Sequence, residues 1–178
     1  MGLDVLDNIK VLHISEPITP TELFARAGKL AIDSGWAREG FIQALTEREA
    51  RYPTGLHTAG VEVAIPHADP EWTLQPGMVV CIANPPVPFQ PMGGLGGEVQ
   101  ARFIFLLTIP SAEAHIDFLQ ALATVIEDEE RLKELEETQD INRLIEYCVR
   151  RLKLKESYIE RTINHGSREV RLKIGQGR

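Results

Sequence analysis

A histidine that follows a proline at the end of an apolar stretch is the residue of this sequence best suited to chemistry. Residues 61–67 read VEVAIPH, so His67 comes directly after Pro66. Proline has a fixed φ and no donor N–H, and it therefore tends to end a strand and begin a turn. A neutral imidazole keeps a nucleophilic ring nitrogen near pH 7 and can take a phosphoryl group reversibly. We therefore predict that His67 is exposed at a strand end and accepts a phosphoryl group; a surface or capping role is the ordinary alternative.

Two charged residues flank this histidine in the sequence. Arg48 stands 19 positions before His67, in the string REARYPTGL, near the predicted end of a helix. Its guanidinium is a planar fork of donors that suits phosphate oxygens, although an arginine at a helix C-terminus is also favourable with the dipole alone. Asp69 is able to accept a hydrogen bond from His67 and fix its tautomer. For Asp69 we favour a simpler role, an Asx turn with Pro70.

A second histidine opens a later helical pattern. His115 lies in the string SAEAHIDFLQALA, with Ile116 and Leu119 on the apolar stripe. At a helix start, a histidine can donate to an anion or orient a second imidazole, and the positive end of the helix dipole helps to hold a phosphate. The ordinary alternative is a solvated histidine in the first turn. If the fold brings His115 and His67 together, the two form a small phosphoryl site.

The other histidines and the glycine-rich string do not match known metal or nucleotide motifs. His13 and His165 stand isolated, His57 lies in the turn LHTAG, and no spacing such as HxxxH supports a zinc site. The string GGLGG is followed by no lysine and lacks the order GxGxxG. We therefore predict neither a metal nor a cofactor.

The predicted elements run in the order strand, two helices, strands and then helices. The first strand covers residues 10–14, and a capping box with proline at the first helical position marks a helix that begins after Thr19. A second helix is predicted over residues 37–49, with its core side chains at Phe41, Ala44 and Leu45. From residue 112 to about residue 152 the pattern is helical again.

Two apolar runs, residues 78–83 and 103–109, are predicted as strands buried on both faces, as happens when helices cover a sheet. The stretch between them, residues 84–97, is rich in proline and glycine and is predicted as a surface loop near the working face. Beyond Leu154, low apolar content makes disorder the default. The alternation of Val170, Leu172 and Ile174 is the exception and is compatible with a short edge strand.

The 178 residues suffice for one globular domain. Charge is distributed unevenly along them. Residues 150–178 hold nine Lys/Arg and three Asp/Glu, a net of +6, so a total of −7 leaves −13 for residues 1–149. An acidic body argues against nucleic acid as a ligand, because that binding requires cations to neutralise phosphates. We divide the chain into a domain of residues 1–152 and a flexible basic extension of residues 153–178.

The sequence has no apolar run of the roughly 18 residues that a membrane helix needs. The N-terminus also lacks a basic start followed by an apolar stretch, and we predict a cytoplasmic protein. Cys81 and Cys148 lie in apolar or helical patterns, without a CxxC motif. They are predicted to be reduced, buried thiols rather than parts of a disulfide framework.

Three strings together resemble a known family. REARYPTGL, VAIPHAD and AHIDFLQALA are similar to the enzyme IIA domains of the fructose and mannitol type from the bacterial phosphoenolpyruvate-dependent sugar phosphotransferase system. The resemblance covers about residues 8–150. Within the family, YPTGL, IPHAD and PVPFQPMG look most like the galactitol-specific members. Two features depart from the mannitol-type pattern: a longer stretch between Thr54 and His67, and the basic extension.

The resemblance implies a single α/β domain with a mixed, about five-stranded sheet flanked by helices. It also implies that the chain is a phosphotransferase component: His67 accepts a phosphoryl group from phosphorylated HPr and passes it to a cysteine of an enzyme IIB protein, without cofactor or metal. In this reading Arg48 steadies the phosphate and His115 hydrogen-bonds the phosphate or the ring. An enzyme IIC complex at the membrane is a further expected partner, and the oligomeric state is left open.

Two other functions compete with sugar uptake. Relatives with the same histidine regulate transporters or transcription through phosphorylation-dependent binding, as in the nitrogen-regulatory kind of enzyme IIA, and the basic extension favours this role. The other is a binding domain that keeps the fold without being phosphorylated. The presence of Arg48, His67 and His115 argues against that last reading.

Overall fold

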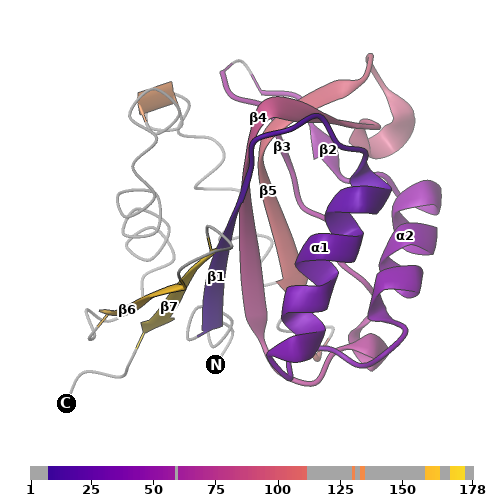
Figure 1. Cartoon of the computed structure of the whole chain (residues 1–178). Helices are drawn as coiled ribbons and strands as arrows, with labels where there is room; N and C mark the ends of the chain where they lie inside the picture. The colour runs from indigo at the N-terminus through magenta and orange to yellow at the C-terminus, as the bar shows by residue number, and fades with distance from the viewer. Residues whose placement is uncertain are drawn as a thin grey trace.

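A mixed β-sheet with helices on one face is the framework of the protein (Figure 1). The computed structural model describes residues 8–58, 60–111, 130, 133–134, 159–164 and 169–174. Five strands lie in the order β2-β3-β5-β4-β1, with β1 parallel to β4, β3 parallel to β5, and the remaining pairs antiparallel. Their bounds are β1 (Asn8–Ile14), β2 (Gly55–Leu56), β3 (Val63–Ala64), β4 (Gly77–Phe89) and β5 (Val99–Thr108). The predicted single α/β domain with a mixed, five-stranded sheet is confirmed.

The helices α1 (Pro20–Asp33) and α2 (Phe41–Arg51) pack on one face of the sheet. The predicted capping box is present: the Thr19 hydroxyl accepts from the Glu22 N–H at 3.2 Å, and the Glu22 carboxylate accepts from the Thr19 N–H at 2.7 Å. The second helix begins four residues later than predicted. Gly40, with φ at 91°, turns the chain immediately before α2, and Ala37 instead forms a β-bridge with Thr73.

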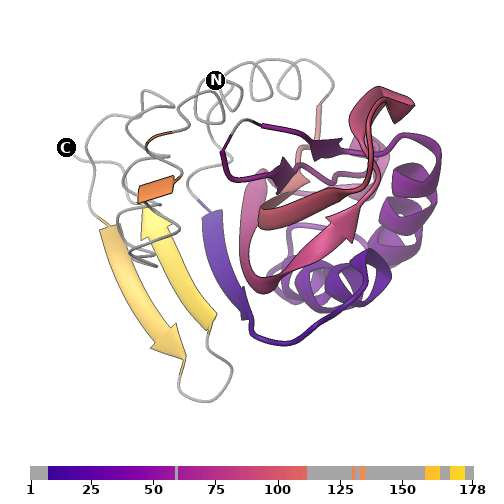
Figure 2. The ribbon, with the colours of Figure 1, turned by 90° about the horizontal axis from the view of Figure 1, so that it is seen from above.

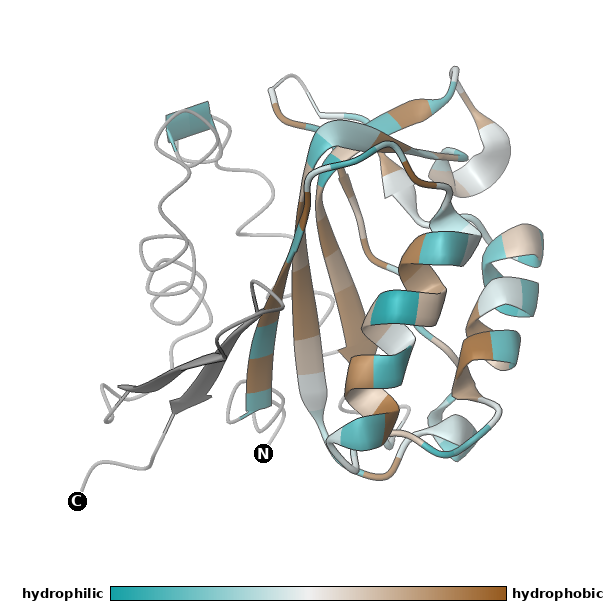
Figure 3. Ribbon diagram, viewed as in Figure 1, coloured by the Kyte–Doolittle hydropathy of each residue, from teal (hydrophilic) through white to brown (hydrophobic). Residues whose placement is uncertain are grey.

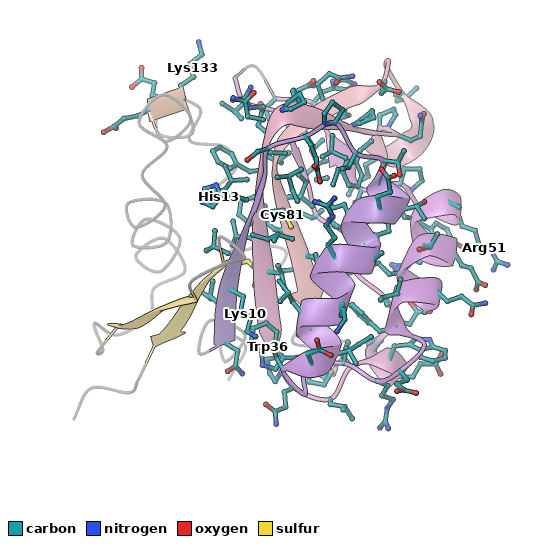
Figure 4. The ribbon with its side chains drawn as sticks, in the orientation of Figure 1. Lys10, His13, Trp36, Arg51, Cys81 and Lys133 are labelled. Atoms are coloured by element: carbon teal, nitrogen blue, oxygen red, sulfur yellow. The ribbon has the colours of Figure 1, made fainter. Side chains whose placement is uncertain are left out.

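Hydrophobic side chains fill the space between the helices and the sheet. Figure 3 shows the apolar sides of both helices turned toward the strands and their polar sides turned outward. The apolar runs that were predicted as strands buried on both faces are buried on both. Successive residues of a strand point to opposite faces, and the neighbours Val79 and Val80 are both almost wholly inaccessible. Cys81 lies in this core (Figure 4), and burial raises the pKa of its thiol to about 12. Cys148 lies outside the described residues.

The predicted loop over residues 84–97 is wrong in its first half. Strand β4 continues to Phe89 and pairs again with β5 from Val87, after a shift in register beyond Ile82. Both Val87 and Phe89 are buried. The prolines at 85 and 86 indicated a loop, but they fall where the pairing with β5 is interrupted, so their missing N–H groups cost the ladder nothing. Only the second half of the segment runs as turns, including the short η3 (Met92–Gly94).

Two further strands extend the sheet past β1 (Figure 2). β7 (Glu169–Ile174) pairs antiparallel with β1, and β6 (Ile159–Asn164) pairs antiparallel with β7. The alternation around Leu172 therefore does mark a strand, as predicted. Disorder as the default beyond Leu154 is wrong for these two segments, and β6 rather than β7 is the outer strand. The division of the chain at residues 152 and 153 stays a prediction.

The helices predicted from residue 112 to about residue 152 lie outside the described residues. Among the residues that the structure describes, no helix is long and apolar enough to cross a bilayer.

Candidate functional site

His67 lies just beyond the end of β3, beside the last turns of α2 and the C-terminal end of β5. It forms a parallel bridge with Leu107, whose N–H donates to the Pro66 carbonyl at 3.1 Å. The predicted strand end is confirmed, but the predicted exposure is wrong, because only 8% of His67 is accessible. The chain continues alongside β5 after Pro66, and Arg48 of α2 lies against the ring. A sequence rule for where a strand ends does not report these neighbours.

The two ring nitrogens of His67 face partners of opposite kind. Nδ1 lies 2.8 Å from the carbonyl oxygen of Ile65, which only accepts hydrogen bonds. Nε2 lies 3.2 Å from Nη2 of Arg48, which only donates. These contacts favour the neutral tautomer with hydrogen on Nδ1 and a lone pair on Nε2. Nε2 is therefore the ring nitrogen that this tautomer leaves able to act as a nucleophile, and it faces a permanent cation.

Arg48 joins this histidine to an acidic and an aromatic neighbour. It stands in the last turn of α2, where the structure places it against His67 as the phosphoryl-site prediction requires. Its Nη1 lies 3.9 Å from a carboxylate oxygen of Asp69, and its guanidinium lies 5.4 Å from the centre of the Tyr52 ring. Its Nε is buried and has no hydrogen-bond partner among the described residues. The guanidinium thus has donor capacity close to the nucleophilic nitrogen.

The Asx turn that we favoured for Asp69 is not present. Asp69 precedes the short η2 (Pro70–Trp72), but its side chain makes no capping hydrogen bond there. The carboxylate faces Arg48 instead. Nδ1 of His67 donates to the Ile65 carbonyl instead. A backbone carbonyl therefore has the role that we considered for Asp69, which is to fix the tautomer of His67.

Glu49 and Thr54 belong to the same cluster, and sequence reasoning did not single them out. The Glu49 carboxylate accepts from the Thr54 N–H at 2.8 Å and from the Thr54 hydroxyl at 2.9 Å. Burial raises the pKa of Glu49 to about 7, although the Thr54 donors and the charge of Arg48 act in the opposite direction. A glutamate beside an arginine on a charged helix usually indicates a solvated face. Only its place in the string REARYPTGL hinted at another role.

A cavity of about 600 Å³ opens between α2 and η2, beside the histidine. Arg48 and Asp69 line it together with Tyr52, which is 64% exposed. Figure 4 shows Arg51, another lining residue, on the outer side of α2. The mixture of charges and aromatic rings in this cavity suits a protein or peptide surface better than a small apolar ligand.

Not every histidine considered from the sequence lies near His67 among the described residues. His115 lies outside the described residues, so its approach to His67 stays a prediction. His57 lies far along the sheet, where it contacts Glu62 and the Gly97 carbonyl. Within the described ranges, no group of three His, Cys, Asp or Glu side chains is arranged to hold a metal ion.

Comparison with known proteins gives consistent matches. Residues 6–150 match the family model described as phosphoenolpyruvate-dependent sugar phosphotransferase system, EIIA 2. The crystal structure of the mannitol enzyme IIA of Escherichia coli is 25% identical with a TM-score of 0.64, over 80% of this chain and 96% of that chain. The same mannitol enzyme IIA in complex with phosphorylated enzyme IIB gives 25% identity and 0.64, over 80% and 94%. The nitrogen regulatory protein IIA-Ntr of Neisseria meningitidis, at 23% identity and 0.63 over 80% and 94%, shares the fold.

Proposed function

Because this chain belongs to the type 2 enzyme IIA family of the phosphoenolpyruvate-dependent sugar phosphotransferase system, we propose that it carries a phosphoryl group on Nε2 of His67. The family makes it a phosphotransferase component. The single observation that carries the proposal is the placement of Nε2, with its lone pair, 3.2 Å from the Arg48 guanidinium while Nδ1 keeps its hydrogen against the Ile65 carbonyl.

In the first step, the Nε2 lone pair attacks the phosphorus of a phosphohistidine on HPr. A P–Nε2 bond forms as the donor's P–N bond breaks, and that electron pair returns to the donor ring. The His67 ring gains positive charge, which the Ile65 carbonyl stabilises because it accepts the Nδ1 hydrogen. The Arg48 guanidinium neutralises charge on the phosphoryl oxygens, and we assign His115 as a second donor to them.

In the second step, a cysteine thiolate of an enzyme IIB protein attacks the phosphorus, and the P–Nε2 bond breaks. A complex of the mannitol enzyme IIA with phosphorylated enzyme IIB exists as a structure, which supports this class of acceptor. The cavity between α2 and η2, with exposed Tyr52 among its lining residues, is our candidate for the docking face. Both partners would bind weakly and leave quickly, since a carrier must release each one after transfer.

Galactitol is the sugar that we propose for the uptake system, on the strings YPTGL, IPHAD and PVPFQPMG. The chain itself handles phosphate and partner proteins, and an enzyme IIC complex at the membrane would move the sugar. The alternative is regulation by phosphorylation-dependent binding, as in nitrogen-regulatory relatives. The observation that favours this alternative is the basic C-terminal region, of net +6 over residues 150–178, part of which extends the sheet as β6 and β7.

The experiment that tests the carrier chemistry is intact-mass measurement after incubation with phosphoenolpyruvate, enzyme I and HPr. We expect an acid-labile gain of one phosphoryl group, about 80 Da, that the His67→Ala variant lacks. A wild-type protein that gains no mass with a cognate HPr contradicts the proposal and points to the unphosphorylated binding domain. Transfer onward to purified enzyme IIB proteins then separates uptake from regulation.

A further inference from the structure

A closed circuit of side-chain and backbone contacts runs from the end of α2 to the histidine and back. Glu49 holds both the N–H and the hydroxyl of Thr54, at 2.8 and 2.9 Å. The Thr54 carbonyl accepts from the Ile65 N–H at 3.3 Å, and the Ile65 carbonyl accepts from Nδ1 of His67 at 2.8 Å. Nε2 of His67 then meets Arg48, the residue next to Glu49 on the helix, at 3.2 Å. Two successive helix residues therefore act on the two nitrogens of one ring.

The middle of this circuit is shielded from water. Thr54 is 4% exposed, Ile65 6% and His67 8%. In such surroundings a donor or acceptor that loses its partner is left unsatisfied away from water, which is costly, so each contact constrains the next one. The other side of the same segment is fixed by β5, where Leu107 donates to the Pro66 carbonyl. Residues 65–67 are thus held from two sides, and Glu49 and Thr54 supply the hold on the side of α2.

The stability of the fold does not explain why a carboxylate is buried at position 49. Burial of Glu49 penalises its charge, as the rise of its pKa shows, and an apolar side chain would avoid that penalty. We propose that Glu49 and Thr54 are a positioning pair, which sets the Ile65 carbonyl so that His67 keeps its hydrogen on Nδ1 and presents Nε2 to Arg48. The inference rests on the proposed function and adds to it the reason why this nitrogen is the nucleophile.

The first test reads the tautomer of His67 directly, by nitrogen chemical shifts and long-range couplings in NMR spectra of the full chain, with His67 identified through His67→Ala. Wild type should show hydrogen on Nδ1. Thr54→Val, which removes the hydroxyl and keeps the shape, and Glu49→Gln should each increase the share of the other tautomer or of exchange between the two. Thr54→Ser, which keeps the hydroxyl, should resemble wild type.

The matched control is Thr46→Val, which removes a hydroxyl that bonds to a carbonyl within α2 and takes no part in the circuit. It should leave the His67 signals unchanged. An unchanged tautomer in both Thr54→Val and Glu49→Gln overturns the inference, and so does a Thr54→Ser protein that behaves like Thr54→Val. If Thr54→Val does not fold, Glu49→Gln provides the same comparison.

The second test measures the rate of phosphoryl uptake from phosphorylated HPr at saturating and limiting donor. A positioning role lowers the maximal rate by about tenfold, the order that one buried hydrogen bond is worth, and leaves the donor concentration for half-maximal rate nearly unchanged. Loss of donor binding alone would contradict it. If wild type takes up no phosphoryl group, the proposed function fails, while the NMR comparison still decides whether Glu49 and Thr54 set the ring.

Discussion

Two histidines at opposite ends of the region around β3, His57 and His67, differ in what their ring nitrogens face. His57 lies near the start of β5, with Nδ1 against the Glu62 carboxylate and Nε2 2.7 Å from the Gly97 carbonyl. Both partners are acceptors and favour a hydrogen on each nitrogen, and the pKa of His57 is raised, first by the Glu62 hydrogen bond and then by Gly97. His67 instead faces the Ile65 carbonyl, an acceptor, at Nδ1 and the Arg48 guanidinium, a donor, at Nε2.

The more accessible of the two imidazoles is not the one whose contacts favour a nucleophilic nitrogen. The His57 side chain is 42% exposed, whereas His67 is 8% exposed. The acceptors at His57 favour its protonated form, and a protonated imidazole has no lone pair to attack phosphorus. At the buried ring, Arg48 rather than an acid faces Nε2. We therefore expect the partner atoms, rather than residue type or exposure, to set which of the two histidines is the better phosphoryl acceptor.

The largest expected effect comes from removing one histidine or the other. His67→Ala should abolish phosphoryl uptake in the mass assay, because no other described nitrogen has the same arrangement of partners. His57→Ala should retain uptake within about twofold, as a surface substitution far from the site does. Uptake lost in His57→Ala and kept in His67→Ala would reverse the assignment of the two rings.

The next effect concerns the cation at Nε2. Arg48→Lys should lower the rate of phosphoryl uptake about 100-fold, the order that loss of one preorganised donor costs. An ammonium lacks the planar fork that can reach the ring and the phosphoryl oxygens together. Arg26→Lys is the matched control, since Arg26 pairs with Glu16 on the surface of α1. Stopped-flow measurement with phosphorylated HPr gives both rates. Equal rates for the two variants would mean that charge alone suffices at this position.

A smaller effect appears in the pH dependence of stability. Glu49 has a pKa of about 7 in the folded state against an ordinary value of 4.5, so the folded state binds more protons than the unfolded state between these values. The stability from this group is present below about pH 4.5 and is lost as the pH rises through about 7, by roughly 3 kcal/mol at 1.4 kcal/mol per pKa unit. Glu49→Gln should flatten this part of the curve in urea denaturation at several pH values. Thr46→Val, which changes no ionisable group, should leave the pH dependence of the curve unchanged.

The smallest effect concerns the other histidine. Glu62→Gln should bring the raised pKa of His57 back toward 6.5, because the amide cannot stabilise the imidazolium as the carboxylate does. The sign follows from a folded pKa above the unfolded one: the stability from the His57 pair is present at low pH and is lost as the pH rises through the folded pKa. NMR titration of the His57 ring protons measures the pKa of His57 in both proteins. A pKa that stays raised in Glu62→Gln would assign the shift to the Gly97 carbonyl instead.

Much of the fold could be predicted because its signals are local. The capping box at Thr19 depends on atoms three residues apart, and the apolar run at residues 78–83 fits the strand that it forms. The missed half of β4 shows where local rules stop. Prolines 85 and 86 indicated a loop, and only the position of β5 decides that the chain can pair again from Val87.

The sequence by itself determined which residues are able to do chemistry here. It indicated the nucleophile type at His67, the cation at Arg48 and the end of the strand before the histidine, because these follow from residue type and from Pro66. Tertiary structure decided which nitrogen keeps its lone pair, since that depends on the Ile65 carbonyl and on a guanidinium from α2. It also decided that Asp69 faces Arg48 and that Glu49 is buried against Thr54. Hydrogen bonding and desolvation act between atoms that only the folded chain brings together, so no spacing in the sequence can encode them alone.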